Sequence, residues 1–353
     1  MKKLSIFDKF IFFLNSLFAT ALLLAYILPY IPPRTFPFLS ILSLGIPILL
    51  ISNIIFLIFW AVKFKKQFIL SLLVLVLGFN HILSLYRVSE KVQTSDDEIS
   101  VMSYNVRQFN RFDWIKNDSV TEQIISFVHE KSPDVLSIQD YYDKENVAFE
   151  GFKNKYIELR ENSSFGQAIF SNYPIINKGS LDFPDTYNNA IFVDIKIKQD
   201  TVRVFNVHLE SLKLIPEVKK LQEEDSDKLI SRVGNSFRKQ QYQTELLLEA
   251  LEKTPYKTII CGDFNNSAFS YVYRKISSGF KDTFTEAGNG FGETYVFDFI
   301  PLRIDVILTD PDFQVNEFKN YDVQLSDHYP IMTRLSFKKQ QEKKTKIKKE
   351  KSK

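Results

Sequence analysis

Six short segments of the chain end an apolar run on an acid, an amide or a histidine. In "GDFNN" the buried-strand pattern of residues 257–262 stops at Asp263 and Asn265. The other five segments are "SYNV" with Asn105, "IQD" with Asp140, "NVHL" with His208, "RID" with Asp305, and "SDHYP" with Asp327 and His328. A turn would explain one such end, because Gly, Asp and Asn are common turn residues. Six of them predict one assembled site, since a rigid scaffold can aim side chains from strand ends.

Carboxylate and amide oxygens with few imidazoles are the ligands that Mg²⁺ or Mn²⁺ prefers, whereas a zinc site would use more His or Cys. Such an ion holds a phosphate oxygen and stabilises the charge that grows on it during attack by water. Two of the four His, His208 and His328, lie in the strand-end motifs. His81 and His129 lie in an apolar stretch and in a helical pattern, where we expect structural roles. The residues therefore predict metal-assisted hydrolysis of a phosphate ester.

The elements that must position these residues lie within residues 97–337. Short apolar runs separated by turn signals predict eight or more strands there, and the spacing predicts helices at 119–131 and 236–252. The stretch 213–235 is charged and weakly periodic, which predicts a surface insertion. Strands and helices mixed in this order predict a layered α/β domain with more than one sheet. The single cysteine, Cys261, lies inside a predicted strand, so we expect a buried structural thiol and no disulfide within the chain.

Residues 1–90 differ from the rest of the chain because Leu, Ile and Phe dominate them. Their pattern predicts a membrane domain with three transmembrane helices, at residues 10–31, 38–62 and 67–86. Each stretch is close to the ~20 apolar residues that cross a bilayer as a helix. A cleaved signal peptide is the competing interpretation of residues 1–31, but that apolar stretch is too long and no A-x-A-like cleavage site follows it.

The positive charges of the short loops predict the orientation of these helices. A single basic residue, Arg34, lies between the first two predicted spans. Lysines gather before the first span and between the second and third, at Lys2, Lys3, Lys9, Lys63, Lys65 and Lys66. We therefore expect the N-terminus and the second loop in the cytoplasm. Three spans then place residues 97–337 on the periplasmic, outer face of the inner membrane of a bacterium.

The net charge of +3 is unevenly distributed along the chain. The segment 338–353 carries nine Lys and two Glu, a local charge of +7, so the other 337 residues together carry −4. This balance does not favour a basic nucleic-acid-binding face on the domain. We expect the segment 338–353 to be a disordered basic tail, open to contact with anionic lipid or nucleic acid.

Taken in order, "SYNV", "IQD", "NVHL", "GDFN", "RID" and "SDHYP" resemble the endonuclease/exonuclease/phosphatase superfamily, which includes deoxyribonuclease-like enzymes. The resemblance covers roughly residues 97–337, and nothing similar to the family lies in residues 1–90. It implies an α/β fold, a four-layer α/β sandwich of two mixed sheets flanked by helices. In this chain the sandwich would be preceded by the three transmembrane helices.

The resemblance also implies a role for each strand-end residue. Asp263 would activate or position the attacking water, and Asn265 would bind the phosphate. His328, oriented by Asp305, would stabilise or protonate the phosphoryl oxygens, because a carboxylate behind an imidazole fixes its tautomer and raises its pKa. His208 would contact the phosphate from the other side.

Mg²⁺, or Mn²⁺, is the cofactor that the resemblance implies, with Asp140, Asn105 and Asp327 as its ligands. Most of the family has Glu where this chain has Asp140, which is one methylene shorter. The backbone at Asp140 would therefore have to lie closer to the metal. Asn189 in "YNNAIF" is a further candidate for phosphate binding.

The predicted function is a metal-dependent phosphoesterase that hydrolyses a phosphodiester at the outer face of the inner membrane. Its substrate would be nucleic acid, DNA or RNA, or a phospholipid headgroup, or a sugar phosphate, because the fold does not choose among them. The alternative is a non-catalytic, membrane-anchored binding module that retains the fold, which the presence of Asp263, Asp305 and His328 disfavours. The membrane bilayer is an expected partner, and the sequence indicates no obligate protein partner.

Overall fold

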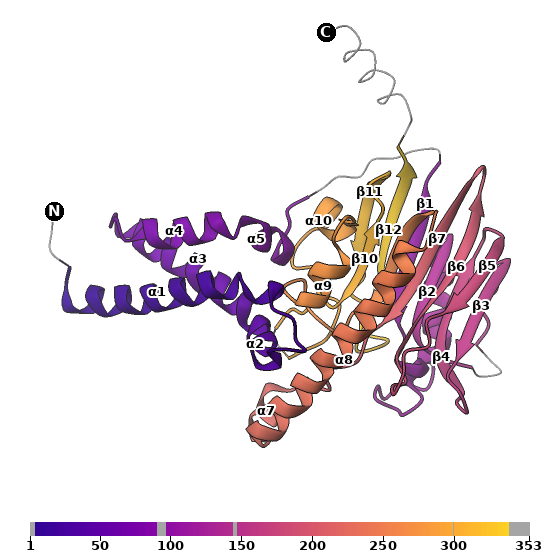
Figure 1. The fold of residues 1–353 in the computed structure, drawn as a ribbon, viewed down its shortest axis with the longest axis horizontal. Helices are drawn as coiled ribbons and strands as arrows, with labels where there is room; N and C mark the ends of the chain where they lie inside the picture. The colour runs from indigo at the N-terminus through magenta and orange to yellow at the C-terminus, as the bar shows by residue number, and fades with distance from the viewer. Residues whose placement is uncertain (1–3, 90–96, 144–146, 299, 339–353) are drawn as a thin grey trace, which may run out of the picture.

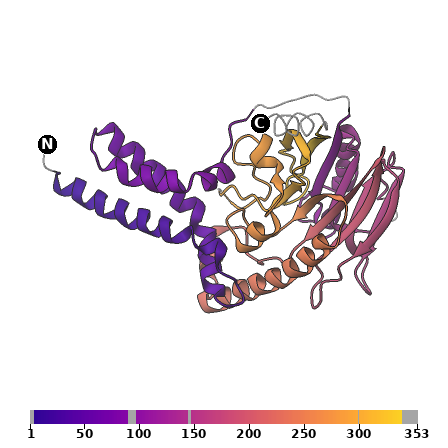
Figure 2. The same cartoon turned by 45° about the horizontal axis from the view of Figure 1, so that its top comes forward.

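The computed structural model describes residues 4–89, 97–143, 147–298 and 300–338. The helices of the first range form a bundle that extends away from a larger α/β body (Figure 1), and the turned view shows the same arrangement (Figure 2). Lys2, Lys3 and all but the first residue of the predicted basic tail lie outside the described residues, so the expectations for them stay predictions.

The bundle contains the elements α1 (Ile6–Ala25), η1 (Leu28–Tyr30), α2 (Pro37–Leu42), η2 (Ser43–Gly45), α3 (Ile46–Val62), α4 (Phe68–Leu77) and α5 (Phe79–Leu85). Two stretches, Ile6–Tyr30 and Pro37–Val62, are long and apolar enough to cross a membrane. The third predicted span, 67–86, is divided between α4 and α5, which are bent by 77° relative to each other. The structure thus supports two spans directly, and a third only if the bent pair crosses as one unit.

The break between α4 and α5 lies at Gly78, where α1 approaches closely. A Cβ atom on residue 78 would lie 1.8 Å from the hydroxyl oxygen of Tyr26. This hydroxyl donates a hydrogen bond to the carbonyl of Val74 at 3.1 Å. The sequence predicts one continuous helix at 67–86 because the residues around Gly78 are apolar. The break was not predicted, since the contact that requires a glycine there comes from Tyr26 at the end of α1.

Two six-stranded sheets form the α/β body. The first has the order β11-β12-β1-β2-β4-β3 and consists of β1 (Ile99–Asn105), β2 (Val135–Tyr142), β3 (Asn154–Leu159), β4 (Phe165–Ser171), β11 (Phe313–Asn320) and β12 (Ile331–Phe337). The second has the order β5-β6-β7-β8-β10-β9 and consists of β5 (Ile175–Ser180), β6 (Asn189–Ile197), β7 (Asp200–His208), β8 (Lys257–Asp263), β9 (Lys281–Asp282) and β10 (Asp305–Thr309). Each sheet has one parallel pair, β1 with β2 and β7 with β8, among antiparallel neighbours, so both sheets are mixed.

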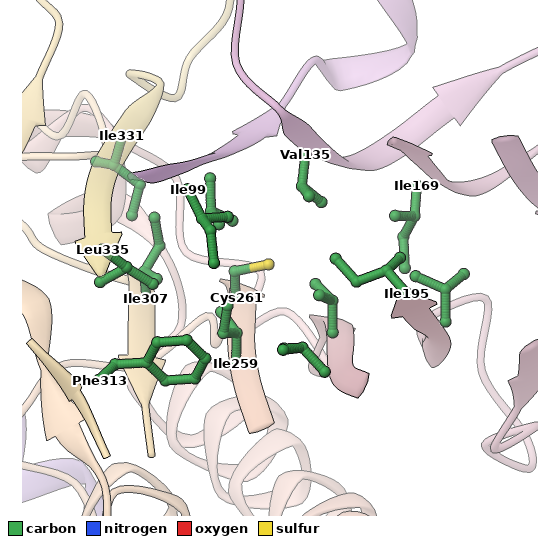
Figure 3. Close-up of a cluster of buried hydrophobic side chains, with 14 of the residues drawn as sticks. Ile99, Val135, Ile169, Ile195, Ile259, Cys261, Ile307, Phe313, Ile331 and Leu335 are labelled. Atoms are coloured by element: carbon green, nitrogen blue, oxygen red, sulfur yellow. The ribbon is translucent and has the colours of Figure 1, made fainter. Parts of the chain in front are cut away.

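The two sheets pack face to face, and their inner faces meet in one apolar core (Figure 3). Ile99 and Val135 of the first sheet point toward Ile259 and Cys261 of the second (Figure 3). Cys261 has no exposed surface, and burial raises the pKa of its thiol to about 12. The prediction of a buried thiol is therefore confirmed.

Helices cover the outer face of each sheet. On the first sheet they are η3 (Arg107–Asn110) and α6 (Val120–Lys131), which bury Ile124 and Val128. On the second sheet they include α8 (Ser226–Glu252) and α9 (Tyr271–Ile276), which bury Leu247 and Val272. The remaining helices of the body are α7 (Val218–Glu223) and α10 (Thr283–Ala287). The predicted sandwich of two mixed sheets flanked by helices is confirmed.

The predicted helix at 119–131 agrees with α6. The stretch 213–235 lies at the surface as predicted, because no residue from 213 to 232 is buried, but Val233, near its C-terminal end, is buried. Most of this stretch belongs to α7 and to the first turns of α8. Val233 is 2% exposed and packs in one cluster with Ile41 and Leu44 of the N-terminal helices. Because these apolar partners come from residues 37–62, far away in the chain, the pattern within 213–235 does not indicate that Val233 is buried.

Candidate functional site

The register of the second sheet places four polar residues in one row across the strand ends. Asn189 lies opposite His208, His208 opposite Asp263, and Asp263 opposite Asp305. Gly262 precedes Asp263 with a φ of +142°, and a Cβ atom there would lie 1.9 Å from the carbonyl oxygen of Val207. Only glycine allows β7 and β8 to approach this closely at the row.

Asp263 lies at the centre of the site and is 1% exposed. Its Oδ1 accepts the backbone N–H of Asn265 at 2.7 Å, and its Oδ2 accepts the side-chain amides of Asn105 at 3.0 Å and Asn265 at 3.1 Å. Nε2 of His208 lies 3.5 Å from Oδ2, and Nε2 of His328 lies 3.7 Å from it. Burial raises the pKa of Asp263, and the neighbouring Asp305 carboxylate raises it further. The surrounding donors offset this cost of holding a buried charge.

His328 and Asp305 form the pair that the sequence predicts. Nδ1 of His328 lies 2.9 Å from Oδ2 of Asp305, and the two side chains are 6% and 2% exposed. Burial alone would lower the pKa of His328, but the carboxylates of Asp305 and Asp263 outweigh it and raise this pKa to about 10. The ring of Tyr295 packs against the imidazole, with centroids 4.9 Å apart. A protonated imidazole fixed in this way presents Nε2–H as a hydrogen-bond donor to the cavity.

Asp140 enters the site from the first sheet at a break in the pairing of β2. The register with β4 shifts between Ile138 and Tyr141, and Asp140 has a left-handed φ of 50°. Such a bulge re-aims a side chain away from the regular alternation of the strand. The Asp140 carboxylate lies 3.6 Å from Nδ1 of His208. Burial raises the pKa of the Asp140 carboxyl, and the negative charge of Asp263 raises it further.

The loop that carries "SDH" is tied to the first sheet. Ser326 donates its hydroxyl to the carbonyl of Asn105 at 2.8 Å, and the backbone N–H of His328 donates to the Ser326 hydroxyl at 3.3 Å. Asn105 itself accepts the backbone N–H of Arg107 at 3.1 Å and donates to Asp263. These bonds hold the end of β1 against the end of β8, so the site lies where the two sheets meet.

Arg107 is a site residue that the sequence alone did not select. Its guanidinium lies 2.9 Å from Asp327 and stacks 4.1 Å above the ring of Trp114. Arg107 begins a run of four residues with left-handed φ angles between 43° and 59°, which ends at Asn110. Non-glycine residues adopt these angles at a cost, and functional sites are where such strain gathers. In the sequence Arg107 is one of many exposed cations, so only its three-dimensional neighbours single it out.

These side chains surround a cavity of about 240 Å³. Its lining consists of Asn105, Arg107, Asp140, Asn188, His208, Ser211, Asp263, Asn265, Tyr295, Asp327 and His328. Asp305 lies directly behind His328. The structure therefore brings together eight of the nine site residues that the sequence predicts, although their individual roles remain predictions.

The ninth residue, Asn189, does not line the cavity. Its side-chain oxygen accepts the backbone N–H of Phe183 at 3.3 Å, and its amide donates to the hydroxyl of Ser180 at 2.8 Å. These bonds hold the connection between β5 and β6. The neighbouring Asn188 lines the cavity instead, with its amide bonded to the carbonyl of Leu209 at 3.0 Å. The structure thus does not place Asn189 where it could contact a phosphate in the cavity, whereas Asn188 lies at the cavity wall. The doubled Asn in "YNNAIF" gave no means of distinguishing the two from the sequence.

The donors of the cavity fit a hard divalent cation. Asp263, Asp305 and His328 offer ligand atoms within 4.8 Å of one another. His328 is already bonded to Asp305, however, and a protonated imidazole cannot bind a metal. The oxygen atoms of Asp140, Asp263 and Asp327 remain, and carboxylate oxygens are the ligands of Mg²⁺ and Mn²⁺.

A family model described as the endonuclease/exonuclease/phosphatase family matches residues 102–328. The chain belongs to this family. The matched range begins three residues before Asn105 and ends at His328, so it holds the polar strand-end residues of all six motifs. Residues 8–85 match a separate model, which is described as a domain of unknown function. A comparison with curated protein sequences gave no match.

Solved structures share the fold of the α/β body. An endonuclease/exonuclease/phosphatase family protein from Bacteroides thetaiotaomicron is 21% identical, with a TM-score of 0.53 over 69% of this chain and 98% of that one. Humanized TDP2 from D. rerio is 16% identical, with a TM-score of 0.54 over 68% and 100%. The catalytic domain of human nocturnin, with a bound sulfate anion, is 15% identical, with a TM-score of 0.51 over 71% and 96%. At these identities the likeness shows a common fold.

The hydrogen bond between His328 and Asp305 predicts that the two act as one unit in hydrolysis. The full-length chain in detergent micelles is assayed on bis(p-nitrophenyl) phosphate. We expect His328→Ala and Asp305→Ala each to lower kcat by about 10²–10⁴-fold, the range of general acid–base contributions. The double variant should lose little more than His328→Ala alone, because Asp305 acts through the imidazole. Asp322→Ala, on the exposed part of the loop that carries His328, is the control. If the loss of kcat in the double variant equalled the product of the two single losses, the pairing would be contradicted.

Proposed function

We propose that the protein is a membrane-anchored phosphoesterase that depends on a divalent metal and hydrolyses a phosphodiester. The observation that carries this proposal is the row His208, Asp263 and Asp305 across β7, β8 and β10, closed by the 2.9 Å bond from His328 to Asp305. These residues place the protonated imidazole of His328 beside a carboxylate, Asp263, that can activate water, at one cavity. Phosphate-ester hydrolysis requires both at the same place.

The residues divide the reaction among them. Asp263 would orient the attacking water and accept its proton, while Asn265 and His208 contact the phosphate. The water oxygen forms a bond to phosphorus, the bond from phosphorus to the leaving oxygen breaks, and the leaving alkoxide takes a proton from solvent to become an alcohol, while Asp263 releases the proton of the attacking water to solvent. His328 would donate Nε2–H to a phosphoryl oxygen, because its pKa near 10 keeps the imidazole protonated at neutral pH.

Asp140, Asp327 and Asn105 would hold Mg²⁺ or Mn²⁺, together with an oxygen of Asp263. The ion would neutralise charge that develops on the phosphoryl oxygens. The left-handed backbone at Asp140 supports this assignment. The bulge can bring the Asp carboxylate, which is one methylene shorter than Glu, closer to the cavity while the rest of β2 keeps its pairing. The solved structure of TDP2 with a single-strand DNA product supports a phosphate-ester substrate by analogy of fold.

The arrangement of charges around the bundle supports a location of the α/β body outside the cytoplasm. The lysine-rich second loop lies beside the start of α1, where Lys63 pairs with Asp8. The first loop lies at the opposite end of the bundle, where Arg34 contacts Gln241 and Glu245 of α8. The helix ends that carry most positive charge are therefore remote from the α/β body (Figure 1), as the positive-inside tendency requires for export of that body.

The proposed function predicts a specific metal dependence at Asp140. Hydrolysis of bis(p-nitrophenyl) phosphate by the full-length chain should disappear with EDTA and return with Mg²⁺ or Mn²⁺. Asp140→Ala and Asp140→Asn should raise the Mg²⁺ concentration for half-maximal rate at least tenfold, because a ligand oxygen is lost. Asp140→Glu should retain activity, since it restores a carboxylate with longer reach. Asp143→Ala, exposed just after β2, is the matched control, and an unchanged Mg²⁺ requirement in Asp140→Ala would contradict the assignment.

The orientation gives a second prediction. A reporter that is active only in the cytoplasm should be inactive when fused after Lys353 and active when inserted after Lys66, in the second loop. Each fusion serves as the expression control for the other, because the same reporter is predicted to lie on opposite sides of the membrane in the two fusions. Full activity of the C-terminal fusion would overturn the proposed location.

A further inference from the structure

A second cavity, mostly apolar and of about 70 Å³, adjoins the catalytic cavity. The two cavities share Ser211, Asn265 and Tyr295. The apolar side chains of its lining are Leu44, Leu212, Leu214, Phe297, Leu302 and Ile304. A substrate whose phosphate lies between His208 and His328 can therefore extend a short hydrocarbon segment directly into this space. Burial of that segment away from water is favourable.

One wall of the apolar cavity comes from the N-terminal helices. Leu44 lies in η2, within the stretch Pro37–Val62 that is apolar and long enough to cross a membrane. It packs in the same cluster as Leu212 and Leu214, which lie in the chain just after His208. A candidate membrane span thus lines the cavity that adjoins the catalytic cavity.

Helix α8 fixes this arrangement, because consecutive residues contact the two parts of the chain. Gln240 donates to the carbonyls of Glu210 at 2.7 Å and Asn265 at 3.2 Å, both in loops of the catalytic cavity. Gln241 accepts the backbone N–H of Arg34 at 2.8 Å. At Gly234 a Cβ atom would lie only 3.3 Å from Pro37. Neighbouring residues of α8 therefore hold both the N-terminal segment, at Arg34 and Pro37, and the catalytic loops.

A larger groove that also borders the catalytic cavity does not suit a polyanion. This groove, of about 680 Å³, meets the catalytic cavity at Arg107 and Asp327. Its charged lining has two cations and three acids, namely Arg107, Lys219, Glu217, Asp298 and Asp327. Nucleic-acid grooves depend on an excess of Lys and Arg that neutralises successive phosphates. The charges favour a substrate with one phosphate group over a polynucleotide.

We propose that the substrate is a phospholipid or a related amphiphilic phosphodiester of the membrane to which the protein is anchored. Its phosphate occupies the catalytic cavity, and its hydrocarbon arm enters the cavity walled by Leu44. This inference rests on the proposed phosphoesterase function. The contact of α8 with α2 holds the site at the bilayer surface, where such a substrate is presented, and the apolar cavity selects it over a fully soluble ester.

The test compares esters that differ only in their acyl chains. The full-length chain, in mixed micelles with Mg²⁺, is assayed on phosphatidylethanolamine and phosphatidylglycerol and on their deacylated counterparts, glycerophosphoethanolamine and glycerophosphoglycerol. Bis(p-nitrophenyl) phosphate and a single-stranded oligonucleotide serve as further substrates. We expect kcat/KM for at least one lipid to exceed that for its deacylated counterpart at least tenfold.

Filling the apolar cavity should weaken or remove this preference for the acylated ester. Leu44→Trp and Leu302→Trp change two lining residues from separate parts of the chain, and each should lower the ratio of lipid to deacylated kcat/KM at least tenfold. Leu42→Trp is the matched control, because Leu42 is 46% exposed on α2 and does not line the cavity. Circular dichroism identifies a variant that fails to fold, and two independent positions keep the test decisive.

The outcomes separate the inference from the proposed function. Hydrolysis of bis(p-nitrophenyl) phosphate without preference for the acylated esters would overturn the inference and leave the phosphoesterase function in place. A preference for the oligonucleotide, or equal losses on acylated and deacylated esters in both Trp variants, would overturn it in the same way. No hydrolysis of any ester would overturn both.

Discussion

The accumulation of negative charge in one small cavity is the constraint on which the rest of this structure depends. Asp140, Asp263, Asp305 and Asp327 meet around it, and burial raises the pKa values of the first two. Such a cluster is stable only when donors and cations surround it. The protonated imidazole of His328 and the guanidinium of Arg107 supply part of the positive charge, and the carboxylate oxygens are suited to a divalent metal.

Two mixed sheets are the means by which the chain brings these groups together. Each sheet has a parallel pair at its centre, and the ends of both pairs meet at one edge of the sandwich. β1 and β2 deliver Asn105 and Asp140, while β7 and β8 deliver His208 and Asp263. The bond between Asn105 and Asp263 joins the two sheets at that edge. The apolar core between the sheets holds this geometry, so packing and chemistry are linked through the strand ends.

Most residues around the cavity could be predicted from the sequence because they lie at strand ends. The features that the sequence did not predict depend on contacts between segments that are distant in the chain. Eight of the nine predicted residues gather around the cavity, since strand register carries the local pattern into space. Arg107 escaped the prediction because its partners, Trp114 and Asp327, meet it only in the fold. The bend at Gly78 and the burial of Val233 depend on other helices in the same way. Among neighbouring amides, Asn188 and Asn189 cannot be distinguished until their hydrogen bonds are known.

The location of a bound metal tests the account most directly. Crystals of the full-length protein grown with Mn²⁺ would show the ion by its anomalous scattering. The account predicts one peak inside the 240 Å³ cavity, at about 2.1–2.2 Å from oxygens of Asp140 and Asp327, with the hydrogen bond from His328 to Asp305 intact. A peak coordinated by Nε2 of His328 and the carboxylate of Asp305, or no peak in the cavity at saturating Mn²⁺, would contradict it.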